Sequence, residues 1–173
     1  MKKKIEKILE AGTRAPNHYY TEPWKFFVLT DEARRALGKT LAEIAKEKMD
    51  DPTTEQNALL LEKQKNKAFR APVIIAVAVE PSDNPKALWV EEIAAVSAAI
   101  QNMLLTAHGL GLGAIWRSGN PCYHPKMKAL FGLQGDAQLL GFVYLGYPNI
   151  EKKISERTPF NEKTVWLNKD FDL

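Results

Sequence analysis

The sequence predicts a layered fold of the α/β or α+β class, in which helices cover a central sheet. Residues 73–79 form a continuous β-branched run, which is typical of a strand buried on both faces. Residues 138–147 show a second buried-strand pattern, and residues 87–109 form a long apolar helix between the two. Strand and helix patterns alternate along the chain, as they do where helices pack on a sheet.

Hydrophobic spacing and turn residues place the other elements. Ile5, Ile8 and Leu9 share one face of a helix near the N-terminus. Asp31 has the residue type of an N-cap for a second helix. The elements expected in chain order are helix 2–13, strand 24–30, helix 34–48, a charged outer helix from Thr53 or Thr54 to Lys67, strand 73–79, helix 87–109, strand 113–116, helix 125–131 and strand 138–147.

The helix expected over 87–109 is apolar around most of its circumference, which indicates a central, buried helix. Small residues such as Ala94 and Ala98 would let another helix approach closely. That pattern fits a subunit interface and a helix buried inside one chain equally well. The segment 150–173 is expected to be an extended arm on its own domain or on a partner subunit, because its apolar side chains are costly to expose.

Composition limits the classes of protein. The 173 residues are expected to form one domain, and a net charge of +3 argues against a dedicated nucleic-acid-binding protein. The most apolar run, 88–112, contains Glu91 and Glu92, so we expect no membrane span and a cytoplasmic protein. The single cysteine, Cys122, excludes an intrachain disulfide, and three histidines far apart in the sequence predict no metal site.

The loop from Arg14 to Trp24 is the first candidate for a binding site. Pro16 and Pro23 exclude a helix and stiffen it. The loop carries His18, a glutamate and several aromatic residues, a combination that suits a flat polar ligand. Taken alone, a histidine such as His18 more often has a structural role than a catalytic one.

The segment after the strand at 113–116 is the second candidate. Loops after strand ends often bind ligands in layered folds, and the planar donors of Arg117 suit phosphate or carbonyl oxygens. A surface salt bridge is the alternative for Arg117. The glycines between Gly109 and Gly113 follow a helix and precede a strand, which predicts a helix C-cap and a tight turn rather than a dinucleotide loop.

Taken in order, these segments resemble compact nitroreductase-family flavoproteins. Arg14-Ala15-Pro16-Asn17-His18, followed by Pro23-Trp24, matches the family pattern R-A-P-x-H-x-x-x-x-P-W. The likeness covers nearly the whole chain. The other matching segments are Phe69-Arg70-Ala71-Pro72, Gly109-Leu110-Gly111, Ile115-Trp116-Arg117-Ser118-Gly119 and Tyr144-Leu145-Gly146.

The resemblance implies an α+β fold with a mainly antiparallel sheet and a homodimer formed through the long helices. It also implies FMN at the dimer interface, contacted by His18 and Glu22 and lined by Trp116, Arg117 and Ser118. The stretch inferred to bind the nicotinamide donor is Thr106, Ala107, His108, Gly109, Leu110 and Gly111.

The activity implied is transfer of a hydride from NAD(P)H to FMN, followed by ping-pong reduction of a nitroaromatic, a quinone or a related acceptor. A reductive enzyme for one specific metabolite and a non-catalytic flavin- or ligand-binding dimer are the alternatives. The family also carries an arginine-rich segment that grips the FMN phosphate, upstream of where this sequence starts. We therefore expect a misassigned or shortened start, or phosphate binding by other cations, and weak FMN binding by the chain as written.

Overall fold

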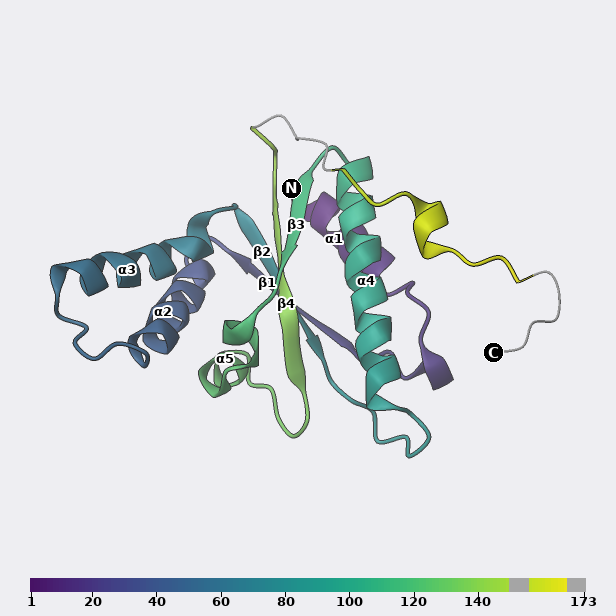
Figure 1. Ribbon diagram of the computed structural model, residues 1–173, viewed down its shortest axis with the longest axis horizontal. Coiled ribbons are helices and arrows are strands. Elements are labelled where there is room, and N and C mark those ends of the chain that lie inside the picture. Colours follow the sequence, from purple (N-terminus) through teal and green to yellow (C-terminus); the bar gives the residue numbers. More distant parts are fainter. Residues whose placement is uncertain (150–155, 168–173) are drawn as a thin grey trace.

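The computed structural model describes residues 1–149 and 156–167 and has α+β architecture (Figure 1). A four-stranded sheet has the strand order β1-β2-β4-β3, and every neighbouring pair is antiparallel. The strands are β1 Trp24–Thr30, β2 Val73–Val79, β3 Gly113–Arg117 and β4 Gln138–Gly146. The helices are α1 Lys2–Gly12, α2 Ala33–Lys46, α3 Glu55–Asn66, α4 Trp89–Gly109 and α5 Pro125–Leu130, with short 3-10 turns η1 His18–Tyr20, η2 Lys67–Phe69, η3 Asn120–Tyr123 and η4 Phe160–Lys163.

Two hydrophobic cores lie on the two faces of the sheet, because successive side chains of a strand point to opposite sides. From β2, Val73, Ile75 and Val77 pack toward α1 and α4. Ile74 and Ala76 pack on the other face, in the core that includes α2 and α5. Burial on both faces explains the continuous apolar run of β2, whose residues are all buried.

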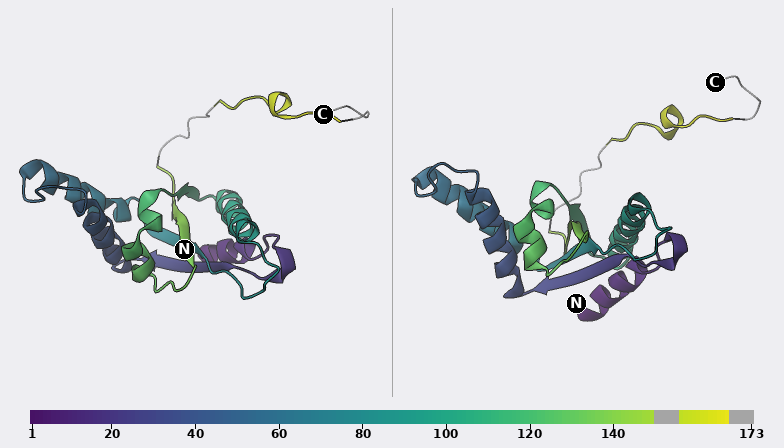
Figure 2. Two further views of the ribbon diagram at one scale, coloured as in Figure 1. Left: turned by 60° about the horizontal axis from the view of Figure 1, so that its bottom comes forward. Right: turned by 90° about the horizontal axis from the view of Figure 1, so that it is seen from below.

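The helices divide between these two faces. Figure 2 shows α1 and α4 on one side of the sheet and α2, α3 and α5 on the other. Helix α3 packs against α2 and has no buried residue, as expected for a charged outer helix. Its N-cap is Thr54, whose side chain accepts a hydrogen bond from the Asn57 backbone N–H.

The N-cap predicted for the second helix is wrong. Helix α2 begins at Ala33, and its N-cap position is held by Glu32 without a side-chain hydrogen bond. Asp31 instead adopts a left-handed φ of 43° in the turn between β1 and α2. Asp tolerates left-handed φ angles better than most residues. Asp31 therefore occupies this turn position and is not the N-cap of α2.

Helix α4 starts at Trp89, two residues later than expected, and only one of its faces is buried in the subunit. Val96, Ile100 and Met103 pack against the sheet. Val90 and Leu105 are 67% and 60% exposed on the remaining surface. The prediction of a buried central helix therefore holds within one subunit for the sheet-facing side alone.

The described part of the C-terminal arm, 156–167, does not pack on the sheet or the helices of the chain. It extends away from the sheet and helices in Figures 1 and 2. Its apolar side chains Phe160, Val165, Trp166 and Leu167 are 65–80% exposed. Residues 150–155 and 168–173 of the predicted arm lie outside the described residues.

Candidate functional site

The loop that carries His18 is a strained turn. Tyr19, Tyr20 and Glu22 have left-handed φ angles of 56°, 54° and 47°. For residues other than glycine this conformation costs about 1–2 kcal/mol each. The Asn17 side chain closes the turn by accepting a hydrogen bond of 2.9 Å from the Glu22 backbone N–H. Strain of this kind is concentrated at binding and active sites, so the turn is a candidate site on conformational grounds.

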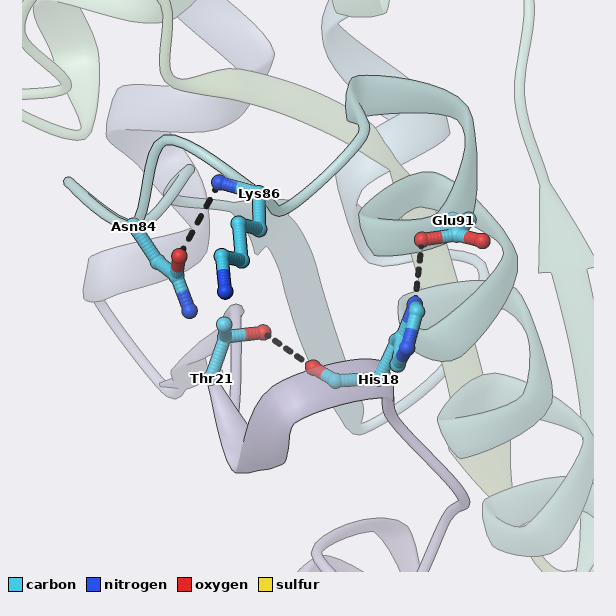
Figure 3. A network of polar contacts seen from close by, with 5 residues as sticks. All are labelled: His18, Thr21, Asn84, Lys86 and Glu91. Carbon is cyan, nitrogen blue, oxygen red and sulfur yellow. Dashed lines mark hydrogen bonds and ion pairs between the residues drawn. The ribbon is translucent and has the colours of Figure 1, made fainter.

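His18 is fixed to the start of α4. Its Nδ1 lies 2.8 Å from Oε2 of Glu91, and Figure 3 shows the two side chains facing each other. The imidazole also stacks on Tyr19, with ring centroids 3.9 Å apart. On the other side of the turn, Lys86 extends toward Thr21 in the same view. The turn thus presents a histidine whose ring is held in place although its side chain is half exposed.

A shallow hollow of about 450 Å³ lies between this turn and α4. Its rim carries the polar side chains of Asn17, His18 and Glu91, and its apolar wall comes from alanines of α4. Tyr20, in the same turn, has 90% of its surface exposed, which excludes a role in the core. An apolar wall with a polar rim suits a flat ring that has hydrogen-bonding groups at its edge.

Trp116 and Arg117 end β3 and point to opposite faces of the sheet. Trp116 is paired with Val143, and its Nε1 donates to the Leu140 carbonyl at 3.4 Å. Gly141, at φ 154°, leaves room for this indole, because a Cβ there would lie 2.4 Å from the Trp116 Nε1. Arg117 is on the other face, with its guanidinium 5.7 Å from the centre of the Tyr144 ring.

Arg117 belongs to a cluster of cations with Lys67 and Arg70, at the side of the sheet covered by α2 and α5. None of these three side chains forms an ion pair within residues 1–149 and 156–167. Burial lowers the pKa of Lys67, and the positive charges of Arg70, Lys63 and Arg117 lower it further. Burial also raises the pKa of the Tyr144 phenol, while Arg117 and Arg70 oppose that shift. Cations without acidic partners create a positive potential that attracts anions, so this cluster is a candidate site for an anion.

Sequence reasoning missed two members of this cluster. Lys67 was noted only as the end of a charged outer helix, and Arg70 only as part of a family pattern. The available signal was their position just before the buried strand β2, which is separated from β3 only by β4. Pairing with β4 sets the start of β2 level with the start of β3, since Val73 and Ala114 both pair with Leu145. The Arg117 side chain then lies over Tyr144 on the same face of the sheet as Lys67, and no pattern in the sequence specifies that neighbourhood.

The stretch from Thr106 to Gly111 is the C-terminal cap of α4. The N–H groups of Gly111 and Leu112 donate to the carbonyls of His108 and Ala107, both at 2.9 Å, with Gly111 at φ 73°. This is the glycine-capped helix end that the sequence predicted. The Leu110 carbonyl accepts a further hydrogen bond of 2.7 Å from Lys4 Nζ.

One subunit does not gather all of the predicted site residues. Thr106 is fifteen residues beyond Glu91, which places it roughly 22 Å along the helix from the His18 contact. Glu22 is exposed and four residues from His18 in the same loop, whereas Arg117 points to the far face of the sheet. Ser118 is exposed just beyond the end of β3. The sites therefore form three separate groups, around His18, around Arg117 and at the end of α4.

Other chemistry has little support in the described residues. The Cys122 thiol is buried, and burial raises its pKa to about 11, so it is poorly suited to act as a nucleophile. No group of three or more potential metal ligands occurs in the described ranges. Among the helices described there, none is long and apolar enough to cross a bilayer.

An antiparallel sheet covered by helices on both faces, with a histidine turn against a long central helix, defines a class that comparison with known proteins identifies. The family model described as "Nitroreductase family" matches residues 1–147. The chain belongs to this family, which confirms the resemblance seen in the sequence.

Individual relatives agree with this assignment. YdjA of Escherichia coli (strain K12), provisionally named an NAD(P)H nitroreductase, is 34% identical over 156 residues, which cover 90% of this chain and 81% of YdjA. A nitroreductase-like family protein from Bacillus cereus has a TM-score of 0.79 at 27% identity, over 98% of this chain and 86% of that one. A Desulfovibrio desulfuricans structure, provisionally named a nitroreductase and solved in complex with FMN, has a TM-score of 0.65 at 26% identity, over 99% and 87% of the two chains. These neighbours confirm the predicted nitroreductase-like α+β fold.

Proposed function

We propose that this protein is an NAD(P)H-dependent flavin oxidoreductase that binds FMN and reduces nitroaromatics, quinones or related acceptors. The observation that carries the proposal is the cluster of Lys67, Arg70 and Arg117, which lacks acidic partners in the described residues. FMN offers such a cluster a phosphate and a ring that becomes more electron-rich on reduction. Relatives named for NAD(P)H chemistry, and one solved with FMN, support the choice of cofactor and reductant.

The residues have distinct roles in this proposal. Arg117, with its planar set of donors, binds phosphate or ring carbonyl oxygens, and Lys67 adds positive charge at the same place. His18 and Glu22 contact the polar edge of the ring from the strained turn, and Trp116 and Ser118 line the site. Thr106 to Gly111 stays a prediction for the nicotinamide donor, because the C-cap already engages several of its backbone groups.

The bound cofactor would supply hydride and electron transfer in two half-reactions, first from NAD(P)H and then to the acceptor, in a ping-pong scheme. The protein's contribution is to hold the ring, exclude water and set the charge around it. We name no acid–base residue, because in this proposal the flavin carries the chemistry and the protein positions it.

The site is completed by a second subunit in this proposal. His18 and Arg117 lie on different sides of one subunit, so a single ligand would touch both kinds of residue only if each subunit supplied one of them. The exposed side chains Val90 and Leu105 of α4 supply an apolar surface for that partner. The arm 156–167, with Trp166 77% exposed, would lie on the partner rather than remain in water. The proposed assembly is a cytoplasmic homodimer.

A groove beside the edge strand β1 gives the arm a place to bind. It is lined mainly by apolar residues of α1 and β1, including Ile5, Leu9 and Val28. One edge of β1 has no neighbouring strand in the described part of the sheet. Unpaired strand edges bind extended segments readily.

Titration with FMN, followed by anaerobic addition of NADPH, tests the function. Binding of FMN, bleaching of its visible absorbance by NADPH and reoxidation by a nitroaromatic would together support the enzyme. Flavin that binds but is not reduced would favour a non-catalytic binding protein. Light scattering that gives a monomer at micromolar concentration would contradict the shared site.

The cation cluster has its own test. Arg117→Ala and Lys67→Met should each weaken FMN binding roughly 10- to 100-fold, the range expected for loss of a hydrogen bond to a charged group. Lys39→Met on α2 is the matched control, because Lys39 is exposed and close to Glu43. Equal FMN affinity in all three variants would remove the cluster from the site.

A further inference from the structure

The His18 turn is joined to α4 by a short contact between ionisable side chains. Nδ1 of His18 and Oε2 of Glu91 are 2.8 Å apart, although 73 positions separate the two residues in sequence. Glu91 is in the first turn of α4, where the helix dipole favours a carboxylate. The contact therefore attaches the ring of a half-exposed histidine to a long, packed helix.

The chemistry of the partners assigns the proton on Nδ1. An ionised carboxylate only accepts hydrogen bonds, so Nδ1 must be the donor. A neutral imidazole carries one ring proton, which leaves the lone pair of Nε2 free. Stacking of the imidazole on Tyr19, with the two ring planes at 16°, is a second contact that holds the orientation of the His18 ring. Nε2 makes no hydrogen bond to the described residues and is left for a ligand.

Neighbouring charges do not compete for Glu91. The Arg14 guanidinium, just beyond the end of α1, lies 3.8 Å from the Glu10 carboxylate of that helix. Glu92, the next residue of α4, is buried and accepts a hydrogen bond of 3.1 Å from the Ser82 backbone N–H. Lys86 extends toward Thr21 on the other side of the turn (Figure 3). The Glu91 carboxylate is thus directed to His18 alone among these groups.

We propose that Glu91 is a positioning residue for flavin binding, which holds the Nδ1 proton and the ring plane of His18 so that Nε2 meets the ligand as a hydrogen-bond acceptor. The pyrimidine edge of an isoalloxazine ring carries one N–H group, and an acceptor nitrogen complements it. The identity of the ligand rests on the proposed function. The tautomer of His18 does not, because it is a property of the flavin-free chain.

The experiment measures the tautomer and FMN binding separately. Two-bond proton–nitrogen correlation spectra of the flavin-free protein, recorded at mildly alkaline pH, report which ring nitrogen carries the proton, and His18→Asn assigns the signal. FMN dissociation constants come from flavin fluorescence. The variants are Glu91→Ala, which removes the acceptor, and Glu91→Gln, which keeps an acceptor oxygen. Glu43→Ala is the control, since its carboxylate has a similar exposure, 44% against 38%, and lies near Lys39 rather than His18.

We expect the wild-type protein and Glu43→Ala to hold the proton on Nδ1. Glu91→Ala should move the proton to Nε2 and weaken FMN binding about 3- to 10-fold, the range for one lost hydrogen bond. Glu91→Gln should restore most of both properties, which a merely structural ion pair would not require.

Two results would overturn the inference. One is a wild-type His18 protonated on Nε2. The other is a tautomer that changes in Glu91→Ala without any change in FMN affinity. If the wild-type protein binds no FMN, the proposed function fails and the flavin role of Glu91 fails with it, whereas the spectra still decide whether Glu91 sets the His18 tautomer.

Discussion

The two ends of α4 carry turns built in opposite ways. At the start of the helix, the His18 turn holds three residues other than glycine in left-handed conformations and leaves Tyr20 almost fully exposed. At the end, Gly111 takes the single left-handed position, and the last carbonyls are bonded to backbone N–H groups and to Lys4.

This difference separates a site from a cap. A turn that satisfies its own hydrogen bonds with a glycine at the left-handed position stabilises the fold and has little left for a ligand. A turn that keeps strained, exposed aromatic residues lowers stability, and its conformation must be held by contacts such as the Asn17 and Glu91 bonds. The two turns should therefore respond differently to mutation.

The largest expected effect on stability is at the glycine end. Gly111→Val should lower the free energy of unfolding by about 2 kcal/mol, because a β-branched residue is strained at φ 73°. Chemical denaturation measures the loss. FMN affinity of the folded variant should stay within twofold of wild type, and a selective fall in NADPH affinity would instead support a nicotinamide role for this turn.

His18→Ala should produce the reverse pattern. We expect FMN affinity to fall by about 1 kcal/mol, as for the loss of one hydrogen bond, while the free energy of unfolding changes little because the side chain is half exposed. Fluorescence titration and denaturation are run on the same samples. Unchanged flavin binding would remove His18 from the site.

Lys4→Met tests the second contact at the helix end. The Lys4 ammonium donates a hydrogen bond of 2.7 Å to the Leu110 carbonyl and lies over the Tyr147 ring. Its loss should lower the melting temperature by an amount equivalent to about 1 kcal/mol, since the bond is charged but partly exposed to water. Lys3→Met, at a neighbouring exposed position, is the control and should leave the melting temperature unchanged.

The smallest effect should come from relief of strain. Tyr20→Gly removes the cost of a left-handed residue, offset in part by the larger entropy of glycine in the unfolded chain, for a net gain of about 0.5 kcal/mol. Thermal denaturation checks the sign. A loss of stability in a protein that still dimerises would mean that the tyrosine makes contacts that outweigh the strain.

The order of elements was accessible from the sequence because each depends on local pattern. The β-branched run of β2 and the glycines after α4 specify a buried strand and a helix cap without reference to other parts of the chain. Asp31 shows the limit, since Asp suits both an N-cap and a left-handed turn position, and the choice depends on how β1 joins α2.

The residues of the candidate site also fall into those that local sequence identifies and those that only tertiary contacts identify. His18 and Arg117 were found because a loop between prolines and an arginine after a strand are local signals. Lys67, Arg70 and Glu91 were not assigned to the site, because their significance comes from partners distant in sequence, as in the 73-residue separation of His18 and Glu91. Their roles depend on which strands pair and where α4 begins.

By itself, the sequence determined the elements, the two loops that carry candidate binding residues and the family to which the chain belongs. Only the tertiary structure decided which groups meet: the Glu91 carboxylate with His18, Arg117 with Tyr144 and Lys67, and Lys4 with the end of α4. The physical reason is the sequence separation over which each kind of interaction acts. Backbone conformation and burial follow from periodicities over a few residues, whereas hydrogen bonds and charge clusters form between side chains that strand pairing and helix packing bring together.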